Sequence, residues 1–307
     1  MEARLQRVRR PRGELAGAFA ERVRAAAQDA DLVHLEETET AWCDAGLDKP
    51  SLVHLHYLTR EDRGLGPPWS RQFREVLDGV RAERAAIRRH RYLVASSPLV
   101  ADGLRARAPG ADVVLAPLSL DPALYRPARL DGPPVAGLIG TAGWGPTAVA
   151  MRLLVEDVWP RVRREAPEAR LLLAGRGPGQ LGLPEAPGAE LAGEVDSARE
   201  LFQRFSLLLF PLPRGSGMKV KVLEALGSGV PVVTTPAGAE GIAASDGVAV
   251  HTEPEALAAA AVELLRDEQA RRERGAAARD TFEKLYSPLP ATEPLIELYR
   301  RLAATRR

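Results

Sequence analysis

The chain has 307 residues, of which 45% are hydrophobic and 27% are charged, and its formal net charge is +1. This composition is ordinary for a globular protein, and the length suits two domains of about 150 residues, each able to bury its own core. The balanced charge gives no indication of a nucleic-acid partner, and no run approaches the roughly 20 apolar residues that a membrane span needs.

The N-terminus and the cysteine content bear on location. The first residues, MEARLQRVRRPRGEL, are basic but lack the apolar core of a signal peptide, so we expect no export. The single cysteine, Cys43, can form no internal disulfide, which fits a reducing compartment and predicts a cytoplasmic protein. The basic terminus is either a solvated chain end or a peripheral contact with anionic lipid or a phosphorylated acceptor. Its arginines are Arg4, Arg7, Arg9, Arg10 and Arg12.

The first half of the chain alternates helical patterns with short apolar, branched runs, which is typical of a parallel sheet covered by helices. The predicted helices are Glu14–Gln28 and Gln72–Arg89. The predicted strands are Asp31–Leu35, Ser51–Tyr57, Arg91–Ala95 and Asp112–Ala116. A complete nucleotide-binding domain usually has about six strands and begins with a strand and a glycine turn. We therefore expect either a reduced N-terminal domain or a chain that starts late.

A Pro- and Gly-rich stretch without periodicity, residues 120–134, is typical of a linker between two doubly wound domains. The alternation resumes after it. The predicted strands are Val135–Gly140, Arg170–Ala174, Ala189–Ala192, Ser206–Phe210, Val230–Thr234 and Val248–Val250. The predicted helices are Thr147–Arg164, Ala198–Arg204, Val220–Leu226, Glu255–Arg266 and Thr292–Ala304. Thr252 and Glu255 are spaced as a capping box for the fourth of these helices.

One segment, residues 206–241, carries most of the chemical information. It reads SLLLFPLPRGSGMKVKVLEALGSGVPVVTTPAGAEG, which predicts a buried strand, a Pro/Gly loop, a helix and a second buried strand. Gly215 and Gly217 let the backbone approach a ligand, and the start of the helix offers free amides to an anion. Lys219 adds charge, while Lys221 and Glu224 share a helix face. This turn offers cations for a diphosphate and a carboxylate for hydroxyl groups, although each feature alone also fits a simple turn or a surface ion pair.

In this segment the chain resembles the donor-site signature of the retaining family-4 glycosyltransferases (glycosyl transferases group 1). One branch of that family reads Pro-Leu-Arg-x-Gly-x-Gly-x-x-x-Lys-x-Leu-Glu-Ala. Further matches follow the family's order: GLIGTAGWGPTAVA at 137–150, ARLLLAGRGPG at 169–179, AGEV at 192–195 and TTPAGAEGI at 234–242. In the first half, KPSLVHLHYL and RYLVASSPLVADGL resemble its middle strands, so the resemblance covers nearly the whole chain.

The resemblance implies an α/β fold of the GT-B type, with two doubly wound Rossmann-like domains whose parallel sheets face each other across a cleft. The N-terminal domain is reduced here. We place this acceptor-side domain at residues 1–128 and the domain that binds the nucleotide-sugar donor at 129–288. A C-terminal helix at 289–307 has the N-terminal domain as its expected packing surface.

The resemblance also implies roles for single residues. Glu224 holds the donor's ribose, Lys221 lies near the donor phosphates, and His56 faces the donor sugar across the cleft. Arg176, at the end of a strand, is a second phosphate ligand, so the expected catalytic residues are His56, Lys221 and Arg176. The other expected donor-binding residues are Gly140, Trp144, Gly215, Ser216, Gly217, Met218, Lys219 and Glu240. Ser216 replaces the first of the family's two glutamates, so the usual contact with the sugar is absent or replaced.

The implied reaction is transfer with retention, in which fixed cations and amides stabilise the leaving diphosphate. We expect no cofactor and no metal. Asp29 and Asp31 formally make an Asp-x-Asp motif, but they lie at a helix-to-strand junction. His34 and His54 lie in apolar strands, where packed, hydrogen-bonded imidazoles are expected.

The sequence leaves the acceptor open: it is a cell-envelope glycan, a lipid-linked acceptor or a small-molecule metabolite. The Ala-, Arg-, Gly- and Pro-rich composition is typical of a high-GC bacterial gene. Two alternatives to the transferase remain. One is an inactive or accessory transferase-like subunit that binds nucleotide, and the other is a sugar-nucleotide epimerase on the same fold.

Overall fold

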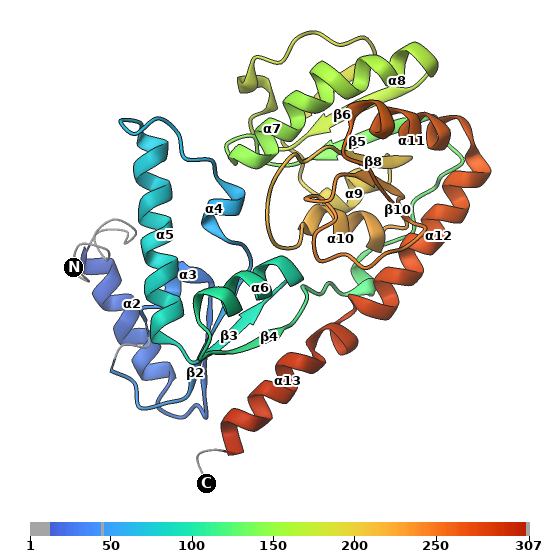
Figure 1. The fold of residues 1–307 in the computed structure, drawn as a ribbon. Helices are drawn as coiled ribbons and strands as arrows, with labels where there is room; N and C mark the ends of the chain where they lie inside the picture. The colour runs from blue at the N-terminus through green and yellow to red at the C-terminus, as the bar shows by residue number, and fades with distance from the viewer. Residues whose placement is uncertain (1–12, 44–45, 305–307) are drawn as a thin grey trace. The chain divides into compact units, whose positions relative to one another are not determined.

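The computed structural model describes residues 13–43 and 46–304 (Figure 1). The basic patch predicted at Arg4–Arg12 lies outside these residues. Two compact units are formed: one contains the described residues up to Pro117 and those from Thr292 onward, and the other contains Leu118–Ala291. Each unit has its own parallel sheet.

The first unit has a four-stranded parallel sheet in the order β1-β2-β3-β4. Its strands are β1 (Val33–Glu36), β2 (Ser51–Leu55), β3 (Tyr92–Ala95) and β4 (Asp112–Leu115). Its helices are α2 (Gly13–Ala26), α3 (Glu37–Thr40), α4 (Thr59–Asp62), α5 (Arg71–Arg89), α6 (Pro98–Arg107) and most of α13 (Pro288–Ala304). The four predicted strands and the predicted helices that correspond to α2 and α5 are confirmed to within two residues. The helices α3, α4 and α6 were not predicted.

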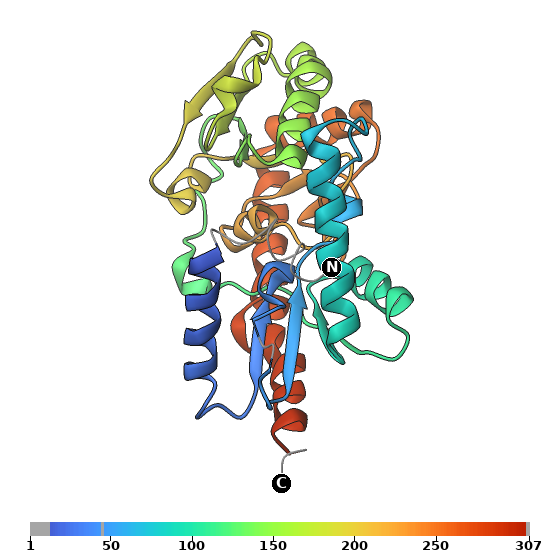
Figure 2. The same ribbon diagram turned by 90° about the vertical axis from the view of Figure 1, so that its left-hand side faces the viewer.

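Both faces of this sheet are covered, because successive residues of a strand point to opposite sides. Val53 and Leu93 face a core that includes Leu104 of α6, and helices α2 and α5 also pack on this face (Figures 1 and 2). Leu52 and Val94 point the other way and pack against α13, with Leu298 and Leu302 among the buried residues. The last helix therefore completes the core of the first unit.

The helix α13 begins earlier than predicted. Pro288 and Pro290 lie in its first turn, where the missing N–H groups would have no partner within the helix. Pro294 lies inside the helix. The helix therefore accommodates all three prolines.

The second unit has a six-stranded parallel sheet in the order β10-β9-β8-β5-β6-β7. Its strands are β5 (Val135–Ile139), β6 (Arg170–Ala174), β7 (Ala189–Gly193), β8 (Leu207–Phe210), β9 (Val232–Thr234) and β10 (Val248–Val250). Its α-helices are α7 (Gly145–Leu153), α8 (Trp159–Glu165), α9 (Ala198–Phe202), α10 (Val220–Gly227), α11 (Pro254–Arg266) and α12 (Glu268–Leu285). Its other helical turns are η1 (Pro122–Leu124), η2 (Leu154–Val158) and η3 (Pro178–Leu181).

The order of these strands creates a switch point. The chain leaves β5 toward β6 and β7, then returns to β8 on the opposite side of β5. In open parallel sheets, ligands bind outside the carboxyl ends of strands at such a point. The carboxyl ends of β5 and β8 are therefore the expected place for a ligand in this unit.

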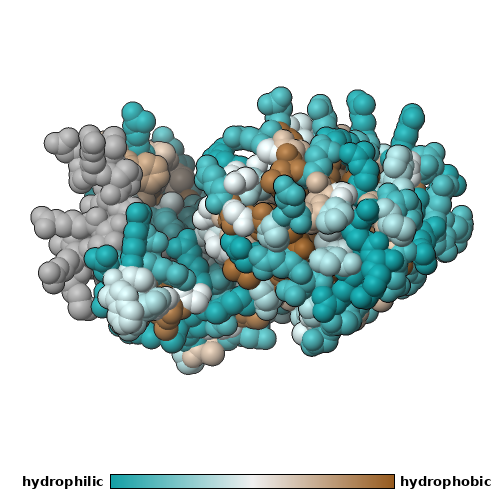
Figure 3. Space-filling view, turned by 90° about the horizontal axis from the view of Figure 1, so that it is seen from above, coloured by the Kyte–Doolittle hydropathy of each residue, from teal (hydrophilic) through white to brown (hydrophobic). Residues whose placement is uncertain are grey.

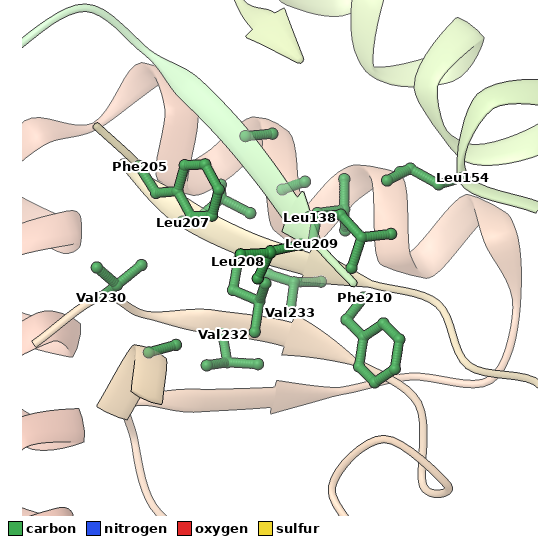
Figure 4. Packing of buried hydrophobic residues seen from close by; sticks show 14 of the residues in the cluster. Leu138, Leu154, Phe205, Leu207, Leu208, Leu209, Phe210, Val230, Val232 and Val233 are labelled. Carbon is green, nitrogen blue, oxygen red and sulfur yellow. The ribbon is translucent and has the colours of Figure 1, made fainter. Parts of the chain in front are cut away.

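The core of the second unit is built on β5, β8 and β9 (Figure 4). All four residues of β8 are buried, as expected for a continuous apolar run in a parallel sheet. Gly137 of β5 is required by packing, since a Cβ atom there would lie 2.2 Å from the Phe205 ring. Phe210 is the last residue of β8, so the core extends to the carboxyl end of this strand, where the switch point lies (Figure 4).

The six predicted strands of this half are confirmed to within two residues, but two helix predictions need correction. The helix predicted at Thr147–Arg164 is interrupted by the π-helical turn η2, which ends just before Pro160, a residue without an N–H to donate. The predicted capping box is wrong, because Glu253 precedes α11 without a side-chain cap. The carboxylate of Glu255 instead accepts hydrogen bonds from Arg161. The helix α12 was not predicted.

The described surface shows no sign of a membrane span. No helix among the described residues is both long enough and apolar enough to cross a bilayer. Figure 3 shows one face of the molecule, on which hydrophilic side chains predominate and hydrophobic ones lie among them in small patches.

Candidate functional site

A pocket of about 280 Å³ lies at the switch point of the second unit. It is bordered by the end of β5 and by the start of α10, the helix that follows β8. Its lining residues are Ile139, Gly140, Met218, Lys219, Val220, Lys221 and Glu224. The structure thus brings together five residues that the sequence predicted for the site: Gly140, Met218, Lys219, Lys221 and Glu224.

The loop between β8 and α10 has the backbone that its glycines permit. Gly215 has φ of +154° and Gly217 has φ of +69°, values that side chains with a Cβ rarely adopt. The Lys219 ammonium donates to the backbone carbonyl of Ser216 at 2.7 Å and to that of Gly217. Lys219 therefore holds the loop together, and Ser216 is buried within it.

Two threonines at the end of β9 also fix this loop: Thr234 is the last residue of the strand, and Thr235 follows it. The Thr234 hydroxyl donates to the Phe210 carbonyl at 2.6 Å, and the Thr235 hydroxyl donates to the Leu212 carbonyl. Both hydroxyls are buried. Buried, satisfied hydrogen bonds of this kind keep a loop in one conformation, so the lining of the pocket is formed before any ligand arrives.

Lys221 places a half-buried ammonium in the pocket. Its Nζ lies 4.6 Å from the centroid of the Phe210 ring and 3.4 Å from the Thr147 hydroxyl. Burial, followed by the nearby charge of Lys219, lowers the pKa of Lys221 to about 8. Gly140 makes room for this group, since a Cβ atom there would lie only 3.1 Å from Nζ. The ammonium is poorly solvated, which favours binding of an anion.

Glu224 lies one turn further along α10. Burial raises the pKa of its carboxyl group, and Oε1 accepts a hydrogen bond of 3.3 Å from the Tyr125 hydroxyl. The same burial, together with the Glu224 charge, raises the pKa of Tyr125 to about 12, so this hydroxyl stays a donor. Sequence reasoning missed Tyr125, because it belongs to the predicted linker and no motif connects it to a residue 99 positions away.

Six other predicted residues lie in the second unit but are not among the residues that line the pocket. Arg176 is in the turn after β6, where its exposed guanidinium forms an ion pair with Glu194 at 2.9 Å. Trp144 is the half-buried residue that precedes α7. Glu240 lies half-buried in the loop after β9. Gly215, Ser216 and Gly217 belong to the loop that borders the pocket.

His56 belongs to the first unit and follows the end of β2. Its Nε2 atom is 2.7 Å from Oε2 of Glu36, and this carboxylate raises the pKa of His56 against the opposing effect of burial. The Ser96 hydroxyl donates to the His56 carbonyl at 3.1 Å. The imidazole is therefore held by residues of its own unit.

The fold matches known structures across almost the whole chain. Sucrose-phosphate synthase from Thermosynechococcus elongatus matches with a TM-score of 0.71 and 18% identity, over 96% of this chain and 81% of that chain. HepE from Anabaena, in complex with UDP and glucose, matches with a TM-score of 0.69 and 16% identity, over 95% and 84%. TarM, a protein of S. aureus, matches with a TM-score of 0.74 and 13% identity, over 94% of this chain but only 58% of that chain.

These neighbours define the fold. It is the GT-B fold, with two Rossmann-like units that each carry a parallel sheet, and the predicted fold class is confirmed. Residues 133–267, which include every residue of the pocket, match the family described as Glycosyl transferases group 1. A search of curated proteins found no match.

Proposed function

We propose that the chain is a glycosyltransferase that moves a sugar from a nucleotide-sugar donor to an acceptor. The observation that carries this proposal is the pair Lys221 and Glu224, a poorly solvated cation and a half-buried carboxylate in one pocket at the switch point. The cation suits a diphosphate, and the carboxylate suits the hydroxyl groups of a ribose. The family match over residues 133–267 and the UDP and glucose bound to the neighbour HepE support this assignment.

The proposed mechanism retains the configuration of the sugar and needs no cofactor or metal ion. Lys221 and the amides of the Gly215–Lys219 loop stabilise the leaving diphosphate, because fixed charges and dipoles act strongly in a poorly hydrated site. Arg176 is proposed as a second phosphate ligand, a role in which the donor phosphate replaces Glu194 as its partner. His56 is proposed to contact the donor sugar from the acceptor side.

The remaining predicted residues, Trp144 and Glu240, are proposed to border the donor. The acceptor is proposed to be a glycan, a lipid-linked sugar or a small molecule, and the single cysteine favours a cytoplasmic location.

Binding of one nucleotide should stabilise the purified chain. We expect the midpoint of thermal unfolding to rise with UDP, GDP or TDP, or with one of their sugars, because a ligand of the folded state adds about 2.7 kcal/mol at a hundredfold excess over its Kd. The nucleotide that raises the midpoint identifies the donor class. If none of these ligands changes the midpoint, the proposed donor site is wrong.

Turnover assays separate the transferase from its two alternatives. A transferase consumes the donor and glycosylates an added acceptor. An accessory subunit binds the nucleotide, as the unfolding assay reports, yet leaves the donor unchanged with every acceptor tested. An epimerase converts the donor sugar when no acceptor is present.

The affinity for a nucleoside diphosphate should fall as the pH rises through about 8. Lys221 is charged below its pKa of about 8 and neutral above it, so the attraction to the diphosphate is lost on the alkaline side. The phosphate itself is fully ionised throughout, since its last pKa is about 6. Titration calorimetry between pH 7 and pH 9.5 measures the change, with the free nucleoside as a control whose affinity stays constant. Equal diphosphate affinity at both ends of the range would show that Lys221 does not contact the phosphates.

A further inference from the structure

A second cluster of ionisable side chains lies in the first unit, on the face of the sheet that α13 covers. His34 and Glu36 lie two positions apart in β1, so their side chains point to the same face of the sheet, the face to which His54 of β2 also points. His56 follows directly after the end of β2, two positions beyond His54. Glu36 is the register partner of His54 in the parallel pair of strands. The backbone therefore brings three imidazoles to one carboxylate.

The distances around that carboxylate are those of a set of metal ligands. Glu36 Oε1 is 3.3 Å from His34 Nε2, and Glu36 Oε2 is 3.7 Å from His54 Nδ1. One ligand atom from each of these three residues lies within 4.8 Å of the other two. Ligands at 2.0–2.1 Å from a tetrahedral zinc ion are about 3.4 Å apart, so a zinc ion needs little movement of these side chains.

We propose that His34, Glu36 and His54 bind one divalent transition-metal ion, of which Zn²⁺ is the best fit. Two imidazoles and one carboxylate are the ligand types that zinc takes in proteins, and three protein ligands leave a fourth position for water or another group. The site is distinct from the pocket beside Lys221, which lies in the other unit and uses no metal in the proposed reaction.

The side chains around the three ligands are arranged to orient them. His34 uses its other ring nitrogen, Nδ1, in a hydrogen bond with the Tyr299 hydroxyl of α13. His56 Nε2 bonds to Oε2 of Glu36 at 2.7 Å. In known metal sites, residues that form hydrogen bonds with the metal ligands (outer partners) fix the orientation of the imidazole rings and the basicity of the ligands. Tyr299 and His56 are therefore positioning residues for the ion.

Burial gives an independent reason to expect a ligand here. Three ring nitrogens of this cluster are buried and form no hydrogen bond in the described structure: His34 Nε2, His54 Nε2 and His56 Nδ1. Buried polar atoms normally have a partner, and each one that lacks it costs stability. A metal ion would satisfy His34 Nε2 directly. Glu36 remains 58% exposed, so an ion has a path from solvent to the site.

The test measures metal binding and needs neither donor nor acceptor. The untagged full chain is stripped with a chelator, desalted, and titrated with Zn²⁺ in competition with a chromophoric chelator. We expect one Zn²⁺ per chain, and a loss of affinity beyond about a hundredfold in His34→Gln and in His54→Gln. His251→Gln is the matched control, because this histidine lies in the second unit, and its affinity should equal that of the original chain.

Two further measurements keep the proposal falsifiable if a ligand variant folds poorly. Tyr299→Phe keeps all three ligands and should weaken Zn²⁺ binding by about 10- to 100-fold, as loss of an outer partner does. Co²⁺ added to the original chain should give the intense visible absorption of a tetrahedral ion. The proposal is overturned by the absence of stoichiometric Zn²⁺ binding, or by undiminished binding in a folded His54→Gln chain. The unfolding assay with nucleotides tests the proposed function independently of this result.

Discussion

The variant Lys221→Ala is expected to lose sugar transfer by about 10²–10³-fold, the effect of removing one fixed group that stabilises developing charge. The ammonium is half-buried, lies 4.6 Å from the Phe210 ring, and occupies space that Gly140 leaves free. In the alanine variant, the departing diphosphate has no Lys221 ammonium to stabilise its charge. The rate of transfer with saturating acceptor, and the donor Kd from calorimetry, measure the loss.

The fold should survive this change. The contacts of the ammonium that support the fold are a 3.4 Å hydrogen bond to Thr147 and the contact with Phe210, which is worth about 0.5–1 kcal/mol. Lys284→Ala is the matched control, since this lysine is exposed on α12 and paired with Asp280. If Lys221→Ala transfers sugar at the rate of the Lys284→Ala chain, Lys221 is not part of the donor site.

The variant Glu224→Ala is expected to weaken nucleotide-sugar binding by at least about a hundredfold. A hydrogen bond to a charged group contributes about 1.5–3 kcal/mol, and a carboxylate can accept one from each of the two ribose hydroxyls. Alanine removes both and also leaves the Tyr125 hydroxyl without its acceptor. Calorimetry with the nucleotide that the unfolding assay identifies gives the change in Kd.

An exposed glutamate supplies the comparison for that result. Glu273→Ala removes a carboxylate on α12 whose partner is Gln269, and its Kd should match that of the original chain. Tyr125→Phe keeps the Glu224 carboxylate and should retain most of the affinity. Unchanged nucleotide affinity in Glu224→Ala would show that the carboxylate is not part of the donor site. If Lys221→Ala also transfers sugar at the original rate, the proposed function is refuted.

The strands were predictable because both sheets are parallel and their central strands are buried. Buried strands appear in a sequence as short continuous apolar runs between Gly, Pro or polar residues. The ten strands in the described part of the chain were predicted to within two residues. Two strands, Arg170–Ala174 and Val248–Val250, have the predicted bounds. The loop and helix that border the pocket were predictable for the same local reason, since Gly215, Gly217, Lys221 and Glu224 lie within ten residues of one another.

Contacts between distant segments were not predictable. Tyr125 meets Glu224 although 99 positions separate them. Gly140 was placed in the same site as Lys221 only by the family resemblance, and the two meet because β5 and β8 are neighbours in the sheet. His34 and His54 were expected to be ordinary packed histidines. Only the register of β1 with β2 brings them to Glu36, and only α13 brings Tyr299 to His34.

The sequence by itself therefore determined which segments become strands and some of the helices, because apolar periodicity and turn residues act over a few positions. It also determined the chemical groups of the donor loop, which are close together along the chain. The tertiary structure decided which side chains of different segments come within bonding distance. Strand order, register and helix packing set those contacts, and they depend on the whole core at once.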